Sequence, residues 1–169
     1  RNEVLYQIGA LTAFTSDKRL QHVKPHGAMY NMAADNIDMA ISICRAVLDV
    51  DAGLILVALA GTPWINIAEK MGVRVAREAF ADRSLNPDGT LVPRQEPGSV
   101  IHDVDKVVRQ SVKIVTEGKA MTINNQEIEV HADTICLHGD TPGAVEIAAT
   151  LRSRLESVGV EIVPLRTLV

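Results

Sequence analysis

Three short apolar runs each end abruptly in polar residues and are followed by a segment with a helical pattern. The runs cover residues 20–23, 73–80 and 134–137. In α/β sheets and barrels, a parallel strand delivers its reactive side chains at its carboxyl end, on the rim that faces the ligand. The recurrence of this pattern predicts an α/β fold with a polar site assembled from distant parts of the chain.

Periodicity extends this prediction along the chain. Helices are expected at 2–17, 31–50, 63–72 and 103–117 and again after Pro142. Strands are expected at 20–24, 54–59, 73–80, 134–137 and 160–163, with a small hairpin of 121–123 and 127–130. The Pro- and Gly-rich segment 81–99 predicts turns, and long ordered loops in compact domains are often functional.

The order of elements indicates one domain, residues 1–169, with a mostly parallel sheet. Its first element is a helix, and about five parallel strands are too few to close an eight-stranded barrel. Either the sheet is open, or strands are missing at the N-terminus.

Composition limits the classes of partner. The 169 residues are 47% hydrophobic and 22% charged with a net charge of −4, without a basic patch, which argues against nucleic acid. No apolar run reaches the roughly 18 residues of a membrane span. Cys44 and Cys136 lie far apart in apolar surroundings, which favours reduced thiols in a cytoplasmic protein.

Lys24 and His26 follow the first strand, two positions apart. In extended structure their side chains face the same way, so the pair suits carboxylate binding or proton transfer. A solvated loop carrying a Lys and a His is an equally open interpretation.

Asp82 and Arg83 follow the third strand. Asp82 could be a base, a metal ligand or an orienting partner, and Arg83 could bind a carboxylate or phosphate. From spacing alone, a structural pair that fastens the following loop is the preferred interpretation.

His138, Gly139 and Asp140 follow the strand at 134–137. Here the glycine lets the backbone approach a ligand, and His138 is the stronger functional candidate. Asp140 could take part in chemistry or cap the next helix, and Thr62 is expected to cap the helix after Pro63.

Several strings in the chain together resemble the LamB/YcsF family. They are VLYQIGAL (4–11), VKPHGAMYN (23–31), LAG (59–61), EAFADR (78–83), DGTLVPR (88–94), PGSVI (97–101) and ICLHGDTP (135–142). Matches of this length, in the same order over nearly the whole chain, are specific.

The resemblance implies an irregular β/α barrel of the glycoside hydrolase and deacetylase type. It also implies that this chain is the C-terminal majority of that barrel, because nothing in it matches the family's N-terminal part. The implied reaction is the ATP-dependent hydrolysis of the 5-oxoproline lactam to L-glutamate, as the A subunit of 5-oxoprolinase working with two further subunits. ATP, with or without Mg²⁺, is the implied cofactor, and no protein metal site or membrane partner is expected. A homo-oligomer is compatible with this reading.

The resemblance also assigns the candidate residues to one site. The residues implied for proton transfer or water activation are His26, Asp82, His138 and Asp140. The residues implied for substrate or phosphate binding are Lys24, Asn31 and Arg83. Two alternatives stay open. One is a metal-dependent, deacetylase-like hydrolase using His26, His138 and Asp82 or Asp140 as ligands. The other is a non-catalytic binding or scaffold subunit of the complex.

Overall fold

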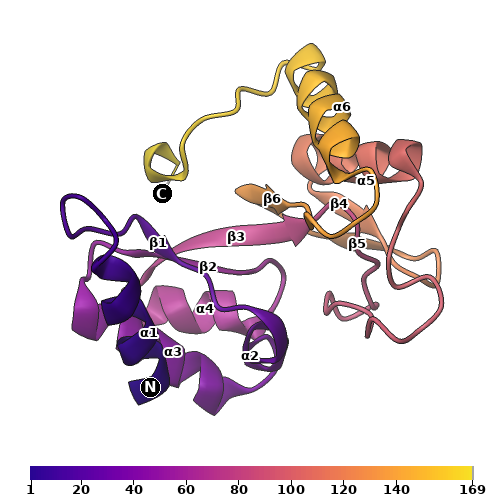
Figure 1. The fold of residues 1–169 in the computed structure, drawn as a ribbon. Coiled ribbons are helices and arrows are strands. Elements are labelled where there is room, and N and C mark those ends of the chain that lie inside the picture. Colours follow the sequence, from indigo (N-terminus) through magenta and orange to yellow (C-terminus); the bar gives the residue numbers. More distant parts are fainter. Residues whose placement is uncertain (169) are drawn as a thin grey trace. The chain divides into compact units, whose positions relative to one another are not determined.

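The computed structural model describes residues 1–168, which form two compact units, Arg1–Arg77 and Glu78–Leu168 (Figure 1). The single-domain expectation is not tested by this division and stays a prediction. None of the helices in the described part of the chain has the length and hydrophobicity needed to cross a bilayer.

The first unit is a small parallel sheet with helices packed along it. Its elements are α1 (Asn2–Thr12), β1 (His22–Val23), α2 (Gly27–Ala33), α3 (Ile37–Val50), β2 (Ile55–Leu59), α4 (Pro63–Lys70) and the beginning of β3 (Arg74–Phe80). Strand β1 pairs in parallel with β2, with His22 opposite Ile55 and Val23 opposite Leu56. All five residues of β2 are buried, as a continuous apolar strand requires.

Two helix predictions in the first unit were wrong in their bounds. The helix expected at 2–17 ends at Thr12, and Phe14 is exposed. The helix expected at 31–50 is two helices, α2 and α3, because Asn36 starts a new one: its side chain accepts a hydrogen bond from the backbone N–H of Met39 at 2.9 Å. Thr62 precedes α4 as predicted, but its hydroxyl donates to the carbonyl of Leu59 instead of capping the helix.

The second unit is built around one parallel strand pair and two packed helices. Its elements are the end of β3, α5 (Val104–Glu117), β4 (Lys119–Met121), β5 (Glu127–Glu129), β6 (Thr134–Cys136), α6 (Ala144–Ser157) and a short 3₁₀ helix, η1 (Leu165–Thr167). Helices α5 and α6 pack on each other over a core of Ala81, Val107, Val108, Ile147, Leu151 and Leu155. Strands β4 and β5 form the predicted antiparallel hairpin, one or two residues from its expected place.

The strand predicted at 160–163 was wrong. These residues, all within the described chain, form no strand, and Val160, Ile162 and Val163 line an apolar cavity together with Ile135 of β6. A strand needs a hydrogen-bonded neighbour, and a short apolar run can line a cavity instead. The α/β class with parallel strand pairing is confirmed.

Both cysteines are free thiols, with Cys44 buried and Cys136 partly buried. Burial raises the pKa of the Cys44 thiol, although a contact with Trp64 partly offsets that effect. Cys44 is therefore a packing residue of low reactivity.

Candidate functional site

The register between β3 and β6 brings Asp82 and His138 together, although they are 56 residues apart in the chain. Phe80 lies opposite Cys136 in this parallel pair, and the backbone N–H of Ala81 donates to the carbonyl of Cys136 at 2.8 Å. Asp82 and His138 each follow their strand by two residues. Equal offsets from paired positions place the two side chains at the same end of the strand pair.

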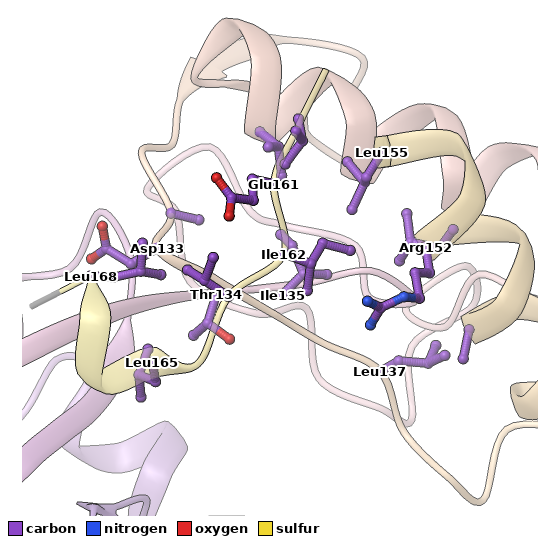
Figure 2. Close-up of a pocket in the computed structure, with 16 residues that line it drawn as sticks. Asp133, Thr134, Ile135, Leu137, Arg152, Leu155, Glu161, Ile162, Leu165 and Leu168 are labelled. Atoms are coloured by element: carbon purple, nitrogen blue, oxygen red, sulfur yellow. The ribbon is translucent and has the colours of Figure 1, made fainter. Parts of the chain in front are cut away.

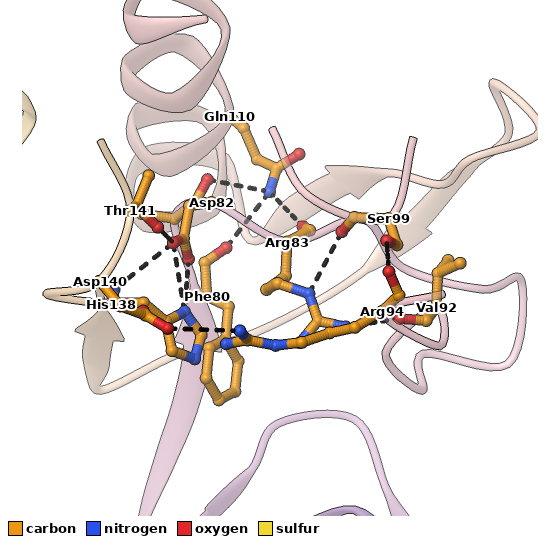
Figure 3. A network of polar contacts seen from close by, with 11 residues as sticks. Phe80, Asp82, Arg83, Val92, Arg94, Ser99, Gln110, His138, Asp140 and Thr141 are labelled. Carbon is orange, nitrogen blue, oxygen red and sulfur yellow. Dashed lines mark hydrogen bonds and ion pairs between the residues drawn. The ribbon is translucent and has the colours of Figure 1, made fainter. Parts of the chain in front are cut away.

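Asp82 is a fully buried carboxylate held by three donors. The ring Nδ1 of His138 lies 2.9 Å from one oxygen, Oδ1, and the hydroxyl of Thr141 donates to the other, Oδ2, at 2.8 Å. The backbone N–H of His138 also donates to Oδ2, at 3.4 Å. These contacts form the network drawn in Figure 3. A buried carboxylate is stable only when its oxygens are satisfied in this way.

This geometry fixes the tautomer of His138. A carboxylate only accepts hydrogen bonds, so Nδ1 carries a hydrogen, and in the neutral imidazole Nε2 is then the acceptor. The two ring nitrogens lie on different sides of the imidazole, so Nε2 faces away from Asp82. The His138 side chain as a whole is 24% exposed.

The ring of Phe80 supports the imidazole of His138 from one face. The two ring centroids are 5.4 Å apart and the planes differ by 18°, a stacked arrangement. Together, Asp82 and Phe80 fix both the rotation and the tilt of the imidazole. A preorganised acceptor of this kind suits general base catalysis.

Gln110 of α5 ties the polar end of β3 to the rest of the second unit. Its side-chain amide donates to the carbonyls of Phe80 and Arg83 at 3.2 and 3.0 Å. Through these bonds, the helix behind the strand holds the backbone on both sides of Asp82.

Arg83 fastens the loop that follows it, at residues 84–99. Its buried guanidinium donates to the backbone carbonyls of Val92 and Ser99. Burial and the neighbouring charge of Arg94 lower the pKa of Arg83, and Asp82 raises it. The loop therefore wraps around the Arg83 guanidinium, as expected if Arg83 has the structural role of fastening this loop.

Asp140 forms an ion pair with Arg94 of the same loop, with 3.6 Å between Oδ2 and the guanidinium. Helix α6 instead begins after Gly143, so Asp140 is not its N-cap residue. Both partners are largely exposed, at 48% for Arg94 and 73% for Asp140. Asp82, Arg83, His138 and Asp140 thus lie in one connected region of the second unit.

The remaining candidates belong to the first unit. The Lys24 ammonium lies 5.8 Å from the ring centroid of Tyr30, a cation–π contact, and Tyr30 packs edge-on against Trp64. His26 precedes α2 as its N-cap residue and is exposed, and Asn31 lies exposed on α2. Their roles stay predictions.

In the described part of the second unit, two of the cavities have neither Asp82 nor His138 in their walls. One, of about 460 Å³, is apolar and lies between β6, α6 and the segment that leads to η1 (Figure 2). The other, of about 500 Å³, is lined by Lys106, Arg109 and Lys113 of α5, with Met121 and Ile123 as apolar walls.

Within the described residues of the second unit, no three His, Cys, Asp or Glu side chains are arranged to hold a metal ion. The carboxylate of Asp82 and the Nδ1 of His138 already bind each other, and Asp140 faces Arg94. These contacts leave the Nε2 of His138 as the ring nitrogen that faces away from Asp82.

Sequence reasoning missed four supporting residues: Phe80, Arg94, Gln110 and Thr141. Thr141 could have been found from its place directly after the polar strand end, where a hydroxyl can reach a neighbouring carboxylate. Arg94 carried a weaker signal, as a cation within an ordered loop. Nothing in the sequence pattern indicates that Gln110 reaches the backbone of β3.

The fold and this region define an α/β protein with a buried carboxylate–histidine pair at the end of two parallel strands. The LamB/YcsF family profile matches residues 1–169. The chain belongs to the LamB/YcsF family.

Relatives and a solved structure agree with that assignment. The chain is 51% identical over 167 residues to a Pyrococcus furiosus protein named as the A subunit of 5-oxoprolinase, covering 98% of this chain and 66% of that protein. A Thermococcus onnurineus protein of the same name is 50% identical over 167 residues, covering 98% of this chain and 66% of the relative. The crystal structure of the lactam utilization protein from Thermus thermophilus matches with a TM-score of 0.83 at 45% identity, covering 94% of this chain and 64% of that one. The chain thus spans about two thirds of the length of these proteins.

Proposed function

We propose that this chain works as the A subunit of an ATP-dependent 5-oxoprolinase, which hydrolyses the 5-oxoproline lactam to L-glutamate. The observation that carries the proposal is the 51% identity, over 98% of the chain, to a protein that bears this name. The Asp82–His138 pair supports it, because a lactam-opening enzyme needs a positioned group that takes a proton from water.

ATP would supply the activation that lactam chemistry needs. The lactam is a resonance-stabilised amide that water attacks slowly. Transfer of the terminal phosphoryl group to the lactam oxygen, with release of ADP, makes the ring carbon electrophilic. Water then adds to that carbon, the C–N bond breaks, and the ring nitrogen takes a proton and leaves as the amino group. A second water hydrolyses the resulting acyl phosphate to L-glutamate and phosphate.

In this scheme His138 is the general base. Its Nε2 takes the proton of the attacking water, and Asp82 stabilises the imidazolium that forms while keeping the ring in place. The same nitrogen can return the proton to the leaving amine. His26 and Asp140 are further candidates for proton transfer, as the family resemblance implies.

Substrate and phosphate binding would use the cationic and amide side chains. Lys24 and Asn31 are the candidates in the first unit. Arg83 is the candidate in the second, where loop carbonyls accept from its Nε and from one of its terminal nitrogens, and its charge can act over a distance. The cationic cavity of about 500 Å³ beside α5 offers Lys106 and Arg109 to the phosphates of ATP.

The proposal also covers the complete fold, the partner subunits and the cellular location. We propose the irregular β/α barrel for the complete protein, two further subunits as partners, and action in the cytoplasm. The two alternative functions have less support, because the relatives bear the name of a 5-oxoprolinase subunit.

The test is to express the full-length gene product with its two partner subunits and to measure L-glutamate formed from 5-oxoproline. The proposal predicts glutamate release that requires ATP and yields ADP. Glutamate release without ATP would contradict the coupling, and no release from an assembled complex would contradict the function. In the same assay, undiminished turnover by His26→Ala would remove His26 from the mechanism.

A further inference from the structure

The guanidinium of Arg94 lies at the edge of the Asp82–His138 region, on a loop whose backbone is fixed by hydrogen bonds. The carbonyl of Arg94 accepts a hydrogen bond from the Ser99 hydroxyl at 3.1 Å, and the Ser84 hydroxyl donates to the carbonyl of Gly98 at 2.6 Å. Arg83 binds the same loop from within, through Val92 and Ser99. The backbone of Arg94 is therefore fixed, although the loop has no regular secondary structure.

The side chain of Arg94 reaches from this loop toward His138 and Asp140 (Figure 3). Asp140, its partner, is two residues beyond His138 in the chain. The separation of 3.6 Å in this pair is longer than an ordinary charge-assisted hydrogen bond, and both side chains are about half exposed or more. An exposed ion pair with this geometry has little stability of its own, so a better anion can replace Asp140.

The charges around Arg94 favour such an anion. The guanidinium groups of Arg83 and Arg94 are close enough to repel, and that repulsion is, after burial, a cause of the lowered pKa of Arg83. Asp82 is buried and engaged with His138 and Thr141, so it does not neutralise Arg94 directly. An added negative charge at Arg94 would relieve the repulsion.

We infer that Arg94 binds the carboxylate of the substrate, displacing Asp140, and so selects carboxylated lactams for attack beside His138. Guanidinium and carboxylate match as planar, bidentate partners, which makes Arg suited to this task. This inference rests on the proposed function for its substrate, 5-oxoproline, but the carboxylate preference can be tested separately.

The experiment compares three probes on the full-length protein, following the ring-proton signals of His138 by NMR. Acetate carries only the carboxylate, 2-pyrrolidinone carries only the lactam ring, and 5-oxoproline carries both. We expect 5-oxoproline to bind more tightly than 2-pyrrolidinone. Arg94→Gln should weaken the binding of 5-oxoproline and acetate by about ten- to a hundredfold while leaving 2-pyrrolidinone unchanged.

Two further variants sharpen the result. Arg94→Lys should fall between the wild type and Arg94→Gln, because it keeps the charge and loses the planar fork. Arg154→Gln removes an exposed arginine of α6 that contacts Ser157, and should bind all three probes like the wild type. Unchanged 2-pyrrolidinone binding also shows that each variant is folded.

Several results would overturn the inference. They are a wild type that binds no carboxylate, an Arg94→Gln variant that keeps the preference for 5-oxoproline, and inorganic phosphate binding more tightly than acetate at equal ionic strength. If acetate binding depends on Arg94 but the assembled complex releases no glutamate from 5-oxoproline, the carboxylate site stands and the proposed function fails.

Discussion

At the scale of single residues, Thr141 holds the oxygen of Asp82 that His138 binds less closely. Its hydroxyl is buried and donates to the carboxylate oxygen Oδ2, the one that lies farther from the His138 ring nitrogen. Because its hydroxyl binds Asp82 and not the His138 ring, its role in the proposed mechanism is to position Asp82.

Replacing Thr141 by Val should lower both stability and catalysis. A buried carboxylate that loses one donor costs about 1–3 kcal/mol, and the His138 ring is then held less firmly. We expect kcat to fall about tenfold, with KM nearly unchanged, in the glutamate-release assay. Thr141→Ser keeps the hydroxyl and should restore most of the activity, so equal kcat values for the Ser and Val variants would contradict this role.

The sequence was sufficient to identify Asp82 and His138 as candidates, but it did not show that they bind each other. Asp82 and His138 were both visible as polar residues just beyond apolar strands. That they bind each other depends on the parallel register of β3 and β6, which places Phe80 opposite Cys136. Register arises from packing along the whole strand pair, so local patterns could not reveal it. For Arg83, the structural interpretation from spacing agrees with its bonds to loop carbonyls.

At the scale of elements, Gly118 joins α5 to the β4–β5 hairpin. It ends α5 in the left-handed region, at φ 66° and ψ 29°, where side chains other than glycine are strained. A Cβ at this position would lie 2.6 Å from ring atoms of His131, closer than atoms can approach.

Gly118→Ala should therefore lower the free energy of unfolding by about 1–2 kcal/mol, measured by chemical denaturation. Adding His131→Ala removes the close contact but not the backbone strain, so the double variant should recover part of the loss. A Gly118→Ala protein as stable as the wild type would contradict this account of the helix end.

The hairpin also carries a pH-dependent ion-pair cluster. Hydrogen bonds from Lys113 of α5 and Lys119 of β4 lower the pKa of Glu127 to about 2, from an ordinary value of 4.5. Because the folded-state pKa is the lower one, the stabilisation is complete above about pH 4.5 and is lost as the pH falls toward about 2.

Thermal unfolding measured across this pH range should show a smaller acid destabilisation in Glu127→Gln than in the wild type. The effect should be small and should weaken in high salt, since all three groups are partly exposed. Glu129→Gln removes the same charge from the same strand and serves as the control. An acid response in Glu127→Gln equal to that of the wild type would rule out this ion-pair cluster as its source.

Element types were predicted more reliably than element ends. The buried strand β2, the hairpin and α5 follow directly from local pattern and turn residues. The division between α2 and α3 depends on the cap formed by Asn36, which a continuous helical pattern conceals. At 160–163 an apolar run predicted a strand that does not form, because a short apolar run alone does not provide a pairing partner.

At the scale of the whole molecule, the family resemblance supplied what spacing could not. The convergence of three polar strand ends predicted a site without naming its chemistry. The LamB/YcsF match along residues 1–169 links those strand ends to proteins named for 5-oxoprolinase and lactam utilization. The central claim is that the Asp82–His138 pair moves the proton when the lactam opens.

The most direct test is the kcat of His138→Asn in the complete complex, measured as ATP-dependent L-glutamate release from 5-oxoproline. Asparagine can still donate to Asp82 in place of Nδ1, but it has no basic nitrogen in place of Nε2. The account predicts a fall in kcat of at least about a hundredfold, with little change in KM. A folded His138→Asn complex with the kcat of the wild type would contradict it.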